Sequence, residues 1–351
     1  MKAYKTEDLR NIGLFSHGGT GKTSLSEAML FDAGAVNRLG RVEEGTTISD
    51  YDADETKRHI SVQLSLLPFE WKGHKANVID TPGYADFVGE MREGIRVVDG
   101  AIVLVDAVGG VEVGTEQVWG YADEYDLPRM VFVNRIDREN ADFSRTVDQL
   151  RAKFGARIVP IQLPIGSQQN FRGVIDLIRM KAFTGPKLDK EEPIPADLVA
   201  QADQAREKLV EAAAETDDTL LNKYLEGEAL SADEIRKGLR GGVVSRRIVP
   251  VLVGSATANW AVVGLMDAVV DYMPSPVDRG EVTVTNPQTN KEEKLPPSDT
   301  APLAAMVFKT TADPYVGRLS YFRVYSGVFH SDSQVINASK THEERIGQLF
   351  T

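Results

Sequence analysis

A glycine-rich segment, SHGGTGKT at residues 16–23, constrains the fold of this chain more than any other feature. It follows an apolar run at residues 11–15, which we expect to be a buried strand, and it precedes a helical stretch at residues 24–31. Glycines let the backbone wrap closely, so that successive N–H groups point at phosphate oxygens, and a helix N-terminus adds positive potential. The segment therefore predicts a P-loop, although Ser16 stands where the usual pattern has glycine.

The residues of this loop have specific expected roles in nucleotide binding. We expect the Lys22 ammonium to reach the β- and γ-phosphates and the Thr23 hydroxyl to ligate Mg²⁺. The other residues contribute mainly backbone N–H groups. The expected binding set in this segment is His17, Gly18, Gly19, Thr20, Gly21, Lys22, Thr23 and Ser24.

A second motif, DTPG at residues 80–83, follows the apolar pair at residues 78–79. An aspartate at the end of a strand can hold the Mg²⁺ shell through water, which is the role we expect for Asp80. The N–H of Gly83 can reach a γ-phosphate, and the segment relaxes when that phosphate leaves. On its own the motif is an ordinary β-turn sequence, but downstream of a P-loop it predicts a switch.

A third motif, NRID at residues 134–137, selects the base. The Asp137 carboxylate can accept from both N1–H and the exocyclic amine of guanine, and adenine offers no such pair of donors. We expect Asn134 to hold the base edge and tie this loop to the P-loop, and Arg135 to stack on the base. This motif predicts guanine rather than adenine.

A fourth and weaker motif, Gly254-Ser255-Ala256, follows the apolar run at residues 248–253. We expect its backbone to contact the guanine O6. The four motifs occur in order, each at the carboxyl end of a predicted strand, where ligands bind in open α/β sheets. They predict a protein that binds GTP and GDP with Mg²⁺. A general P-loop ATPase is the alternative, and Asp137 argues against it.

The loop at residues 45–61 is expected to be the first, mobile switch. One of its hydroxyls should contact Mg²⁺, and we place Ser61 in the metal site with Thr23 and Asp80. The candidate hydroxyls are Thr46, Thr47 and Ser61.

The same loop carries three alternating carboxylates that suggest a Ca²⁺ loop. That reading fails, because Glu55 stands where the turn glycine belongs and Ser61 where the bidentate glutamate belongs. We interpret the acidic run as a solvated loop. Its members are Asp50, Asp52 and Asp54.

Apolar runs alternate with helical stretches through the first half of the chain, which favours an α/β fold with a doubly wound, mostly parallel sheet. We expect a P-loop GTPase domain at residues 1–276, with an inserted α/β subdomain at about residues 166–247. A linker with one hairpin follows at residues 277–302, and an incomplete β-barrel at residues 303–351. A last strand at residues 345–350 would leave an open edge, which indicates a fragment of a longer protein.

The composition excludes several classes of protein. The chain has 351 residues, a net charge of −12 and no cysteine, so it has no disulfide framework and no thiolate metal site. Residues 1–10 lack the apolar core of a signal peptide, and no apolar run approaches the roughly 20 residues that span a bilayer. We expect a cytoplasmic protein without a membrane or DNA partner, whose RNA contacts would use local patches.

Together, these motifs resemble translation elongation factor G over essentially the whole chain. The resemblance implies hydrolysis of GTP to GDP and phosphate, stimulated by the ribosome. It also implies a monomer that contacts ribosomal RNA and the stalk protein, the latter through the inserted subdomain. The segments that carry the resemblance are residues 11–13, 16–23, 80–83, 131–138, 254–256, 265–276, 313–319 and 322–327.

Three positions depart from the pattern of that family. Gly19 replaces an aspartate of the P-loop, and residues 58–61 read RHIS instead of RGIT. Tyr84 replaces the histidine that the ribosome positions against the attacking water, as in a divergent subgroup that is similar to elongation factor G. A phenol can orient water but carries no positive charge near neutral pH. The catalytic candidates are Tyr84, Lys22 and Gly83.

Two other functions remain open at this stage. A nucleotide-gated binding module would load GTP, change shape and occupy a protein or ribosomal partner with little hydrolysis, and both Tyr84 and Gly19 favour it. A release-type or ribosome-protection GTPase would differ in distal domains that this sequence does not contain.

Overall fold

The computed structural model describes residues 4–287, 289–313 and 317–350. The chain divides into two compact units: Asp8–Pro274 forms one, and Ser275–Thr351 with the N-terminal residues to Glu7 forms the other. Residues 314–316, which belong to one of the motifs shared with elongation factor G, lie outside the described part of the chain. Among the described residues, no helix is long and apolar enough to cross a membrane.

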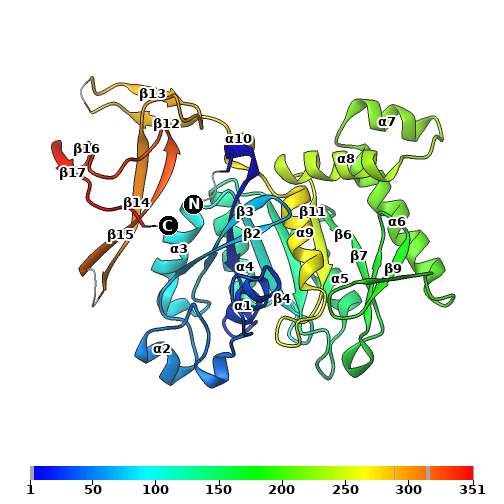
Figure 1. Cartoon of the computed structure of the whole chain (residues 1–351). Helices are drawn as coiled ribbons and strands as arrows, with labels where there is room; N and C mark the ends of the chain where they lie inside the picture. Colours follow the sequence, from blue (N-terminus) through cyan, green and yellow to red (C-terminus); the bar gives the residue numbers. More distant parts are fainter. Residues whose placement is uncertain (1–3, 288, 314–316, 351) are drawn as a thin grey trace. The chain divides into compact units, whose positions relative to one another are not determined.

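The larger unit is built on a seven-stranded sheet (Figure 1). Only β2 runs antiparallel to its neighbour, and the other pairings are parallel. The expected doubly wound, mostly parallel sheet is therefore confirmed. In spatial order the strands are β2 (Ser65–Trp71), β3 (His74–Asp80), β1 (Leu9–Phe15), β4 (Gly100–Asp106), β5 (Arg129–Asn134), β11 (Val249–Val253) and β6 (Ile158–Pro160).

The central strands are almost entirely buried, as expected for a parallel sheet covered on both faces. Two helix pairs cover the sheet: α1 packs with α9, and α3 packs with α4. The helices of this part are α1 (Lys22–Asp32), α2 (Ala53–Arg58), α3 (Val88–Arg96), α4 (Val113–Glu124), α5 (Phe143–Phe154) and α9 (Val262–Tyr272). Short 3-10 turns are η1 (Thr6–Asp8), η2 (Val42–Glu44), η3 (Ala85–Phe87) and η4 (Gln168–Asn170).

A second sheet and three helices lie between β6 and β11 in the sequence, drawn in green in Figure 1. The sheet is antiparallel, in the order β10-β9-β8-β7, and α6 packs closely against α8. The helix α8 of this insertion packs on β11, the strand that leads into the fourth motif. Its elements are β7 (Gln162–Ile165), β8 (Gly173–Asp176), β9 (Lys181–Thr184), β10 (Lys190–Glu192), α6 (Val199–Ala214), α7 (Asp218–Leu225) and α8 (Ala232–Val244).

The described residues of the smaller unit form one short helix and three two-stranded antiparallel sheets. The strand that we expected at residues 345–350 is wrong, because β17 ends at Arg345. The backbone after it bonds to the turn before β16 instead: Leu349 N donates to Ser331 Oγ, and Asp332 N donates to Gly347 O. The elements are α10 (Pro276–Arg279), β12 (Val282–Thr285), β13 (Glu292–Leu295), β14 (Ala304–Asp313), β15 (Gly317–Ser326), β16 (Gln334–Asn337) and β17 (His342–Arg345).

The close packing of α6 on α8 yields a prediction about stability. A Cβ at Gly238 would lie 2.5 Å from the carbonyl oxygen of Ala213, so Gly238→Ala must push the two helices apart. We expect it to lower the free energy of unfolding by about 1–3 kcal/mol, measured by urea denaturation. Gly241→Ala on the same helix is the control, because the nearest atom there, on Thr216, is 3.9 Å away. It should raise stability by about 0.5–1 kcal/mol, and equal effects at both positions would contradict the packing argument.

Candidate functional site

The glycine-rich loop leads from the end of β1 into α1 in the conformation that anion binding requires. Gly19 and Gly21 adopt left-handed φ values of 76° and 98°, which side chains with a Cβ rarely adopt. The helix begins at Lys22, and no side chain caps its N-terminus. Its first N–H groups are therefore available to an oxyanion.

The Lys22 side chain lies buried between this loop and the DTPG turn. Its Nζ donates a hydrogen bond to Ser16 Oγ at 2.8 Å, so the serine that departs from the usual pattern holds the ammonium. Burial lowers the pKa of Lys22 to about 8, against the opposing effect of Asp80 and Asp50. A Cβ at Gly83 would collide with Lys22 Nζ and lie 2.9 Å from Gly18 Cα. The turn and the loop thus lie in direct contact.

The three residues predicted for the metal site meet in one place. Thr23 Oγ1 donates to Asp80 Oδ2 at 2.9 Å, and it lies 2.9 Å from Ser61 Oγ. Asp80 is buried, and its Oδ1 accepts no hydrogen bond from the described residues. Burial raises the pKa of Asp80 to about 7, and Lys22 opposes that rise. Hydroxyl and carboxylate oxygens are ligands that suit Mg²⁺.

Asp50 was missed by the sequence reasoning, and the solvated-loop interpretation is wrong for it. The residue is only 4% exposed, and in the described part of the chain neither carboxylate oxygen has a hydrogen bond of normal geometry. Burial raises the pKa of Asp50 to about 6, while the nearby Ser61 hydroxyl lowers it. Asp54, by contrast, is exposed, and Asp52 caps α2. The capping-box spacing of Asp52 and Glu55 could have predicted the start of α2, but no local pattern indicates the burial of Asp50.

The other two hydroxyl candidates make no contact with the metal-site residues. Thr46 Oγ1 bonds to the backbone of Arg41, and the buried Thr47 Oγ1 has no hydrogen-bond partner among the described residues. Ser61 is therefore the hydroxyl of this loop that the fold brings to Thr23.

Asn134 joins three of the motifs. Its Nδ2 donates to the carbonyl oxygen of Thr20 at 2.8 Å, and its Oδ1 accepts from the N–H of Ala256 at 2.9 Å. The residue is buried at the end of β5. One amide side chain thus fixes the P-loop, the third motif and the fourth motif relative to one another.

The carboxylate of Asp137, which the sequence predicts to select the base, has an oxygen that can accept hydrogen bonds. Asp137 Oδ1 is buried and has no partner among the described residues, an arrangement that costs stability unless a ligand supplies donors. Arg135 adopts a left-handed φ of 63° and pairs with Asp106 at 2.9 Å. The ion pair holds the Arg135 guanidinium at the end of β4. Its stacking on a base stays a prediction.

The amides of the fourth motif already have protein partners. Gly254 N donates to Val133 O, Ser255 N donates to Trp260 O, and Ala256 N donates to the Asn134 side chain. A contact from this segment to guanine O6 would share or replace one of these bonds. In the structure the motif is bonded to β5 through Val133 and Asn134.

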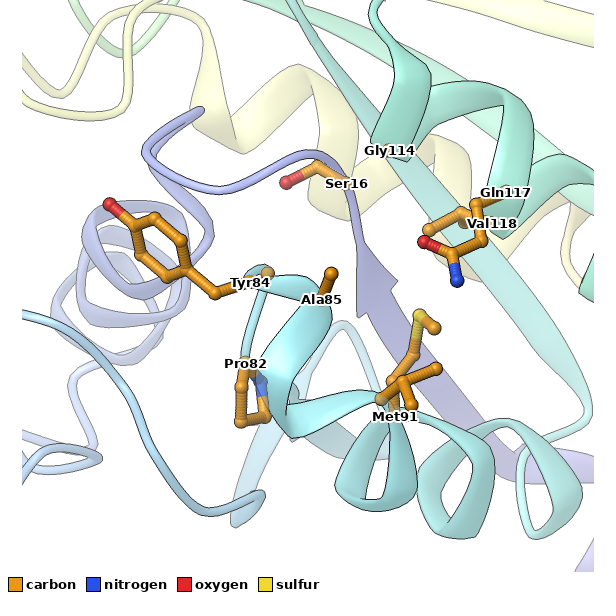
Figure 2. A pocket seen from close by; sticks show the side chains of 10 residues that line it. Ser16, Pro82, Tyr84, Ala85, Met91, Gly114, Gln117 and Val118 are labelled. Atoms are coloured by element: carbon orange, nitrogen blue, oxygen red, sulfur yellow. The ribbon is translucent and has the colours of Figure 1, made fainter.

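Tyr84 is the exposed member of the catalytic candidates. A Cβ at Gly18 would lie 3.0 Å from its ring, so the phenol lies over the P-loop, and the residue is 45% exposed. Figure 2 shows the ring turned away from Met91 and Val118, which line a small pocket between the P-loop, η3 and α4. His17 also lies at the surface, with its Nε2 3.7 Å from Glu112 Oε1.

Comparison with known proteins assigns both parts of the chain. The family model for the elongation factor Tu GTP binding domain matches residues 7–275, and the model for elongation factor G domain 2 matches residues 302–351. A crystal structure of a protein from Thermus thermophilus matches with a TM-score of 0.84 and 33% sequence identity. That match covers 96% of this chain and 48% of the other, so the chain spans about half the length of that protein.

The double role of Asn134 yields a prediction. Asn134→Ala leaves the Thr20 carbonyl and the Ala256 N–H without partners, which should lower the free energy of unfolding by about 2–4 kcal/mol. Urea denaturation measures this change, and hydrogen exchange should show a faster Ala256 amide. Asn222→Ala, at an exposed site on α7, is the control and should change stability by less than about 0.5 kcal/mol. An unchanged Ala256 amide in the Asn134 variant would show that the tie is not formed in solution.

Proposed function

The chain belongs to the family of translational GTPases that carry the elongation factor Tu GTP binding domain, followed by elongation factor G domain 2, and from this we propose that it binds GTP and GDP with Mg²⁺ and switches on the ribosome. One observation carries the proposal: the fold gathers all four motifs at one edge of the sheet and leaves buried carboxylate oxygens without donors at both ends of the site. Such atoms are costly unless a ligand satisfies them.

The residues at one end fit a hydrated Mg²⁺. Thr23 and Ser61 would supply hydroxyl oxygens, and Asp80 and Asp50 would accept from water in its shell. The ion would neutralise charge on the β- and γ-phosphates. Lys22 would add its ammonium to the same phosphates, because it is already held beside the Gly83 turn.

The residues at the other end fit guanine. Asp137 Oδ1 would accept from the base donors, and Asn134 holds the loop in place. The remaining members of the proposed GTP-binding set act mainly through backbone groups. They are His17, Gly18, Gly19, Thr20, Gly21, Ser24, Gly83, Arg135, Gly254, Ser255 and Ala256.

We further propose that hydrolysis is slow in the isolated protein and is stimulated by the ribosome. Positioning the attacking water is the main task of such a site, and Tyr84 is the side chain near the P-loop that would orient it. Its hydroxyl can hydrogen-bond to water without adding positive charge. The presence of Tyr84 also supports our proposal that the chain belongs to the divergent subgroup that is similar to elongation factor G.

The proposed partners follow from the family. The chain would act as a monomer in the cytoplasm and contact ribosomal RNA and the stalk protein, the latter through the helices α6 to α8 of the insertion. A second candidate function is a nucleotide-gated binding module with little hydrolysis. The exposure of Tyr84 favours it, because a phenol that is 45% exposed is not enclosed with a water molecule as a catalytic group would be.

The base selection by Asp137 yields a prediction. Asp137→Asn replaces an acceptor by a donor, so we expect the affinity for GTP to fall about 100-fold or more. Xanthosine triphosphate, which presents a carbonyl in place of the amine, should bind this variant better than GTP does. Titration with fluorescent nucleotides measures both affinities. Asp148→Asn, at an exposed site on α5, should leave them unchanged. Equal affinity of the wild type for ATP and GTP would reject guanine selection.

The proposed role of Tyr84 yields another prediction. Ribosomes should raise steady-state GTP hydrolysis by the protein about tenfold or more. Tyr84→Phe should lower the stimulated rate, Tyr84→His should raise it, and GTP affinity should stay the same in both. Phosphate release with and without ribosomes measures these rates. Tight GTP binding without any stimulation would favour the binding module instead.

A further inference from the structure

Two buried glutamates hold the backbone of the first switch at the points where it faces the site. Glu27 projects from α1 and is 1% exposed, and Glu55 lies in α2 and is also 1% exposed. Neither belongs to the four motifs. The first switch contributes two polar side chains to the proposed cation site, Asp50 and Ser61. Each glutamate accepts hydrogen bonds from the backbone close to one of them.

Glu27 fixes the backbone beside Asp50. Its Oε1 accepts from Ile48 N at 2.5 Å, and its Oε2 has no hydrogen-bond partner among the described residues. The loop passes so close that a Cβ at Gly40 would collide with the Glu27 side chain. Asp50 follows directly, and its carboxylate is turned inward.

Glu55 fixes the backbone beside Ser61 in the same manner. Its Oε1 accepts from Val62 N at 2.9 Å and Gln63 N at 3.0 Å. Its other oxygen accepts from Asp52 N at 3.2 Å and so closes the capping box of α2. Ser61 immediately precedes the held amides and meets Thr23.

We propose that Glu27 and Glu55 are positioning residues for the cation site: Glu27 acts through Asp50, and Glu55 acts through Ser61. Neither glutamate touches the ion or the nucleotide. A buried carboxylate is a strong acceptor for backbone N–H groups, and two such anchors keep a long loop in the one arrangement that closes the site. This inference rests on the proposed binding of nucleotide with Mg²⁺.

The test measures the release of fluorescent GDP from the protein in saturating Mg²⁺ and in EDTA. In the wild type, Mg²⁺ should slow release strongly. Glu27→Gln and Glu55→Gln keep the side-chain shape but replace the carboxylate by a neutral amide, which is a weaker acceptor for the backbone N–H groups. We expect each to raise the rate in Mg²⁺ about tenfold while the rate in EDTA stays within about twofold of the wild type. The control is Glu234→Gln, since Glu234 also accepts from a backbone N–H, that of Ser231, but lies on α8.

Double variants separate positioning from general loss of structure. If Glu27 acts through Asp50, then Glu27→Gln should add less than about twofold in the Asp50→Asn background. Glu55→Gln should likewise add little in the Ser61→Ala background. Hydrogen exchange should be faster at the amides of Ile48 and Val62 in the respective single variants.

Each contrary result has a distinct meaning. Equal acceleration in Mg²⁺ and EDTA, or effects that multiply fully in the double variants, would overturn the positioning roles. If the rate of GDP release from the wild type is the same in Mg²⁺ and in EDTA, the proposed cation site is rejected, and this inference is rejected with it. Strong Mg²⁺ dependence in the wild type with unchanged glutamate variants would overturn the inference alone and leave the proposed function in place.

Discussion

The rest of the site depends on a small group of charges that the fold takes out of water. Lys22, Asp80 and Asp50 are all buried. Burial lowers the pKa of Lys22 and raises the pKa of both aspartates, so that it favours the neutral form of each group. Burying a charge costs several kcal/mol unless it is paired and hydrogen-bonded. Here the pairing is incomplete, because oxygens of both aspartates lack donors. A cation and a polyphosphate would complete the pairing, so binding would offset the free-energy cost of burying these charges.

The strand order of the sheet brings these buried charges together. β1 lies between β3 and β4, so the P-loop emerges beside the end of the strand that carries Asp80. Asn134 then adds β5 and β11 by its two hydrogen bonds. The first switch is held separately, by buried glutamates and by the bond from Leu64 N to Glu90 of α3. That bond links the segment before β2 to the helix that follows the DTPG turn.

Sequence reasoning identified the parts of the site that are set by local pattern. Each motif follows an apolar run and lies at a strand end, so the placement of residues such as Lys22 and Asp80 at this edge of the sheet was readable from spacing alone. The inward turn of Asp50 was not, because it depends on Glu27, which is 23 positions away and bonds to backbone. The pairing of Arg135 with Asp106 and the end of β17 were hidden for the same reason: both are decided by contacts between segments distant in the sequence.

The residues proposed for binding and the residue proposed for hydrolysis differ in their exposure to solvent. The side chains proposed to bind phosphate, metal and base edge are mostly buried and held by protein bonds, as Lys22 is by Ser16 and Asn134 is by Thr20. Tyr84 is nearly half exposed and lies on the surface of the P-loop. A partner can reach and reorient the phenol without disturbing the buried network. Under the proposed function, the replacement of histidine at this position would affect how a partner triggers hydrolysis, and nucleotide binding would depend on the buried residues.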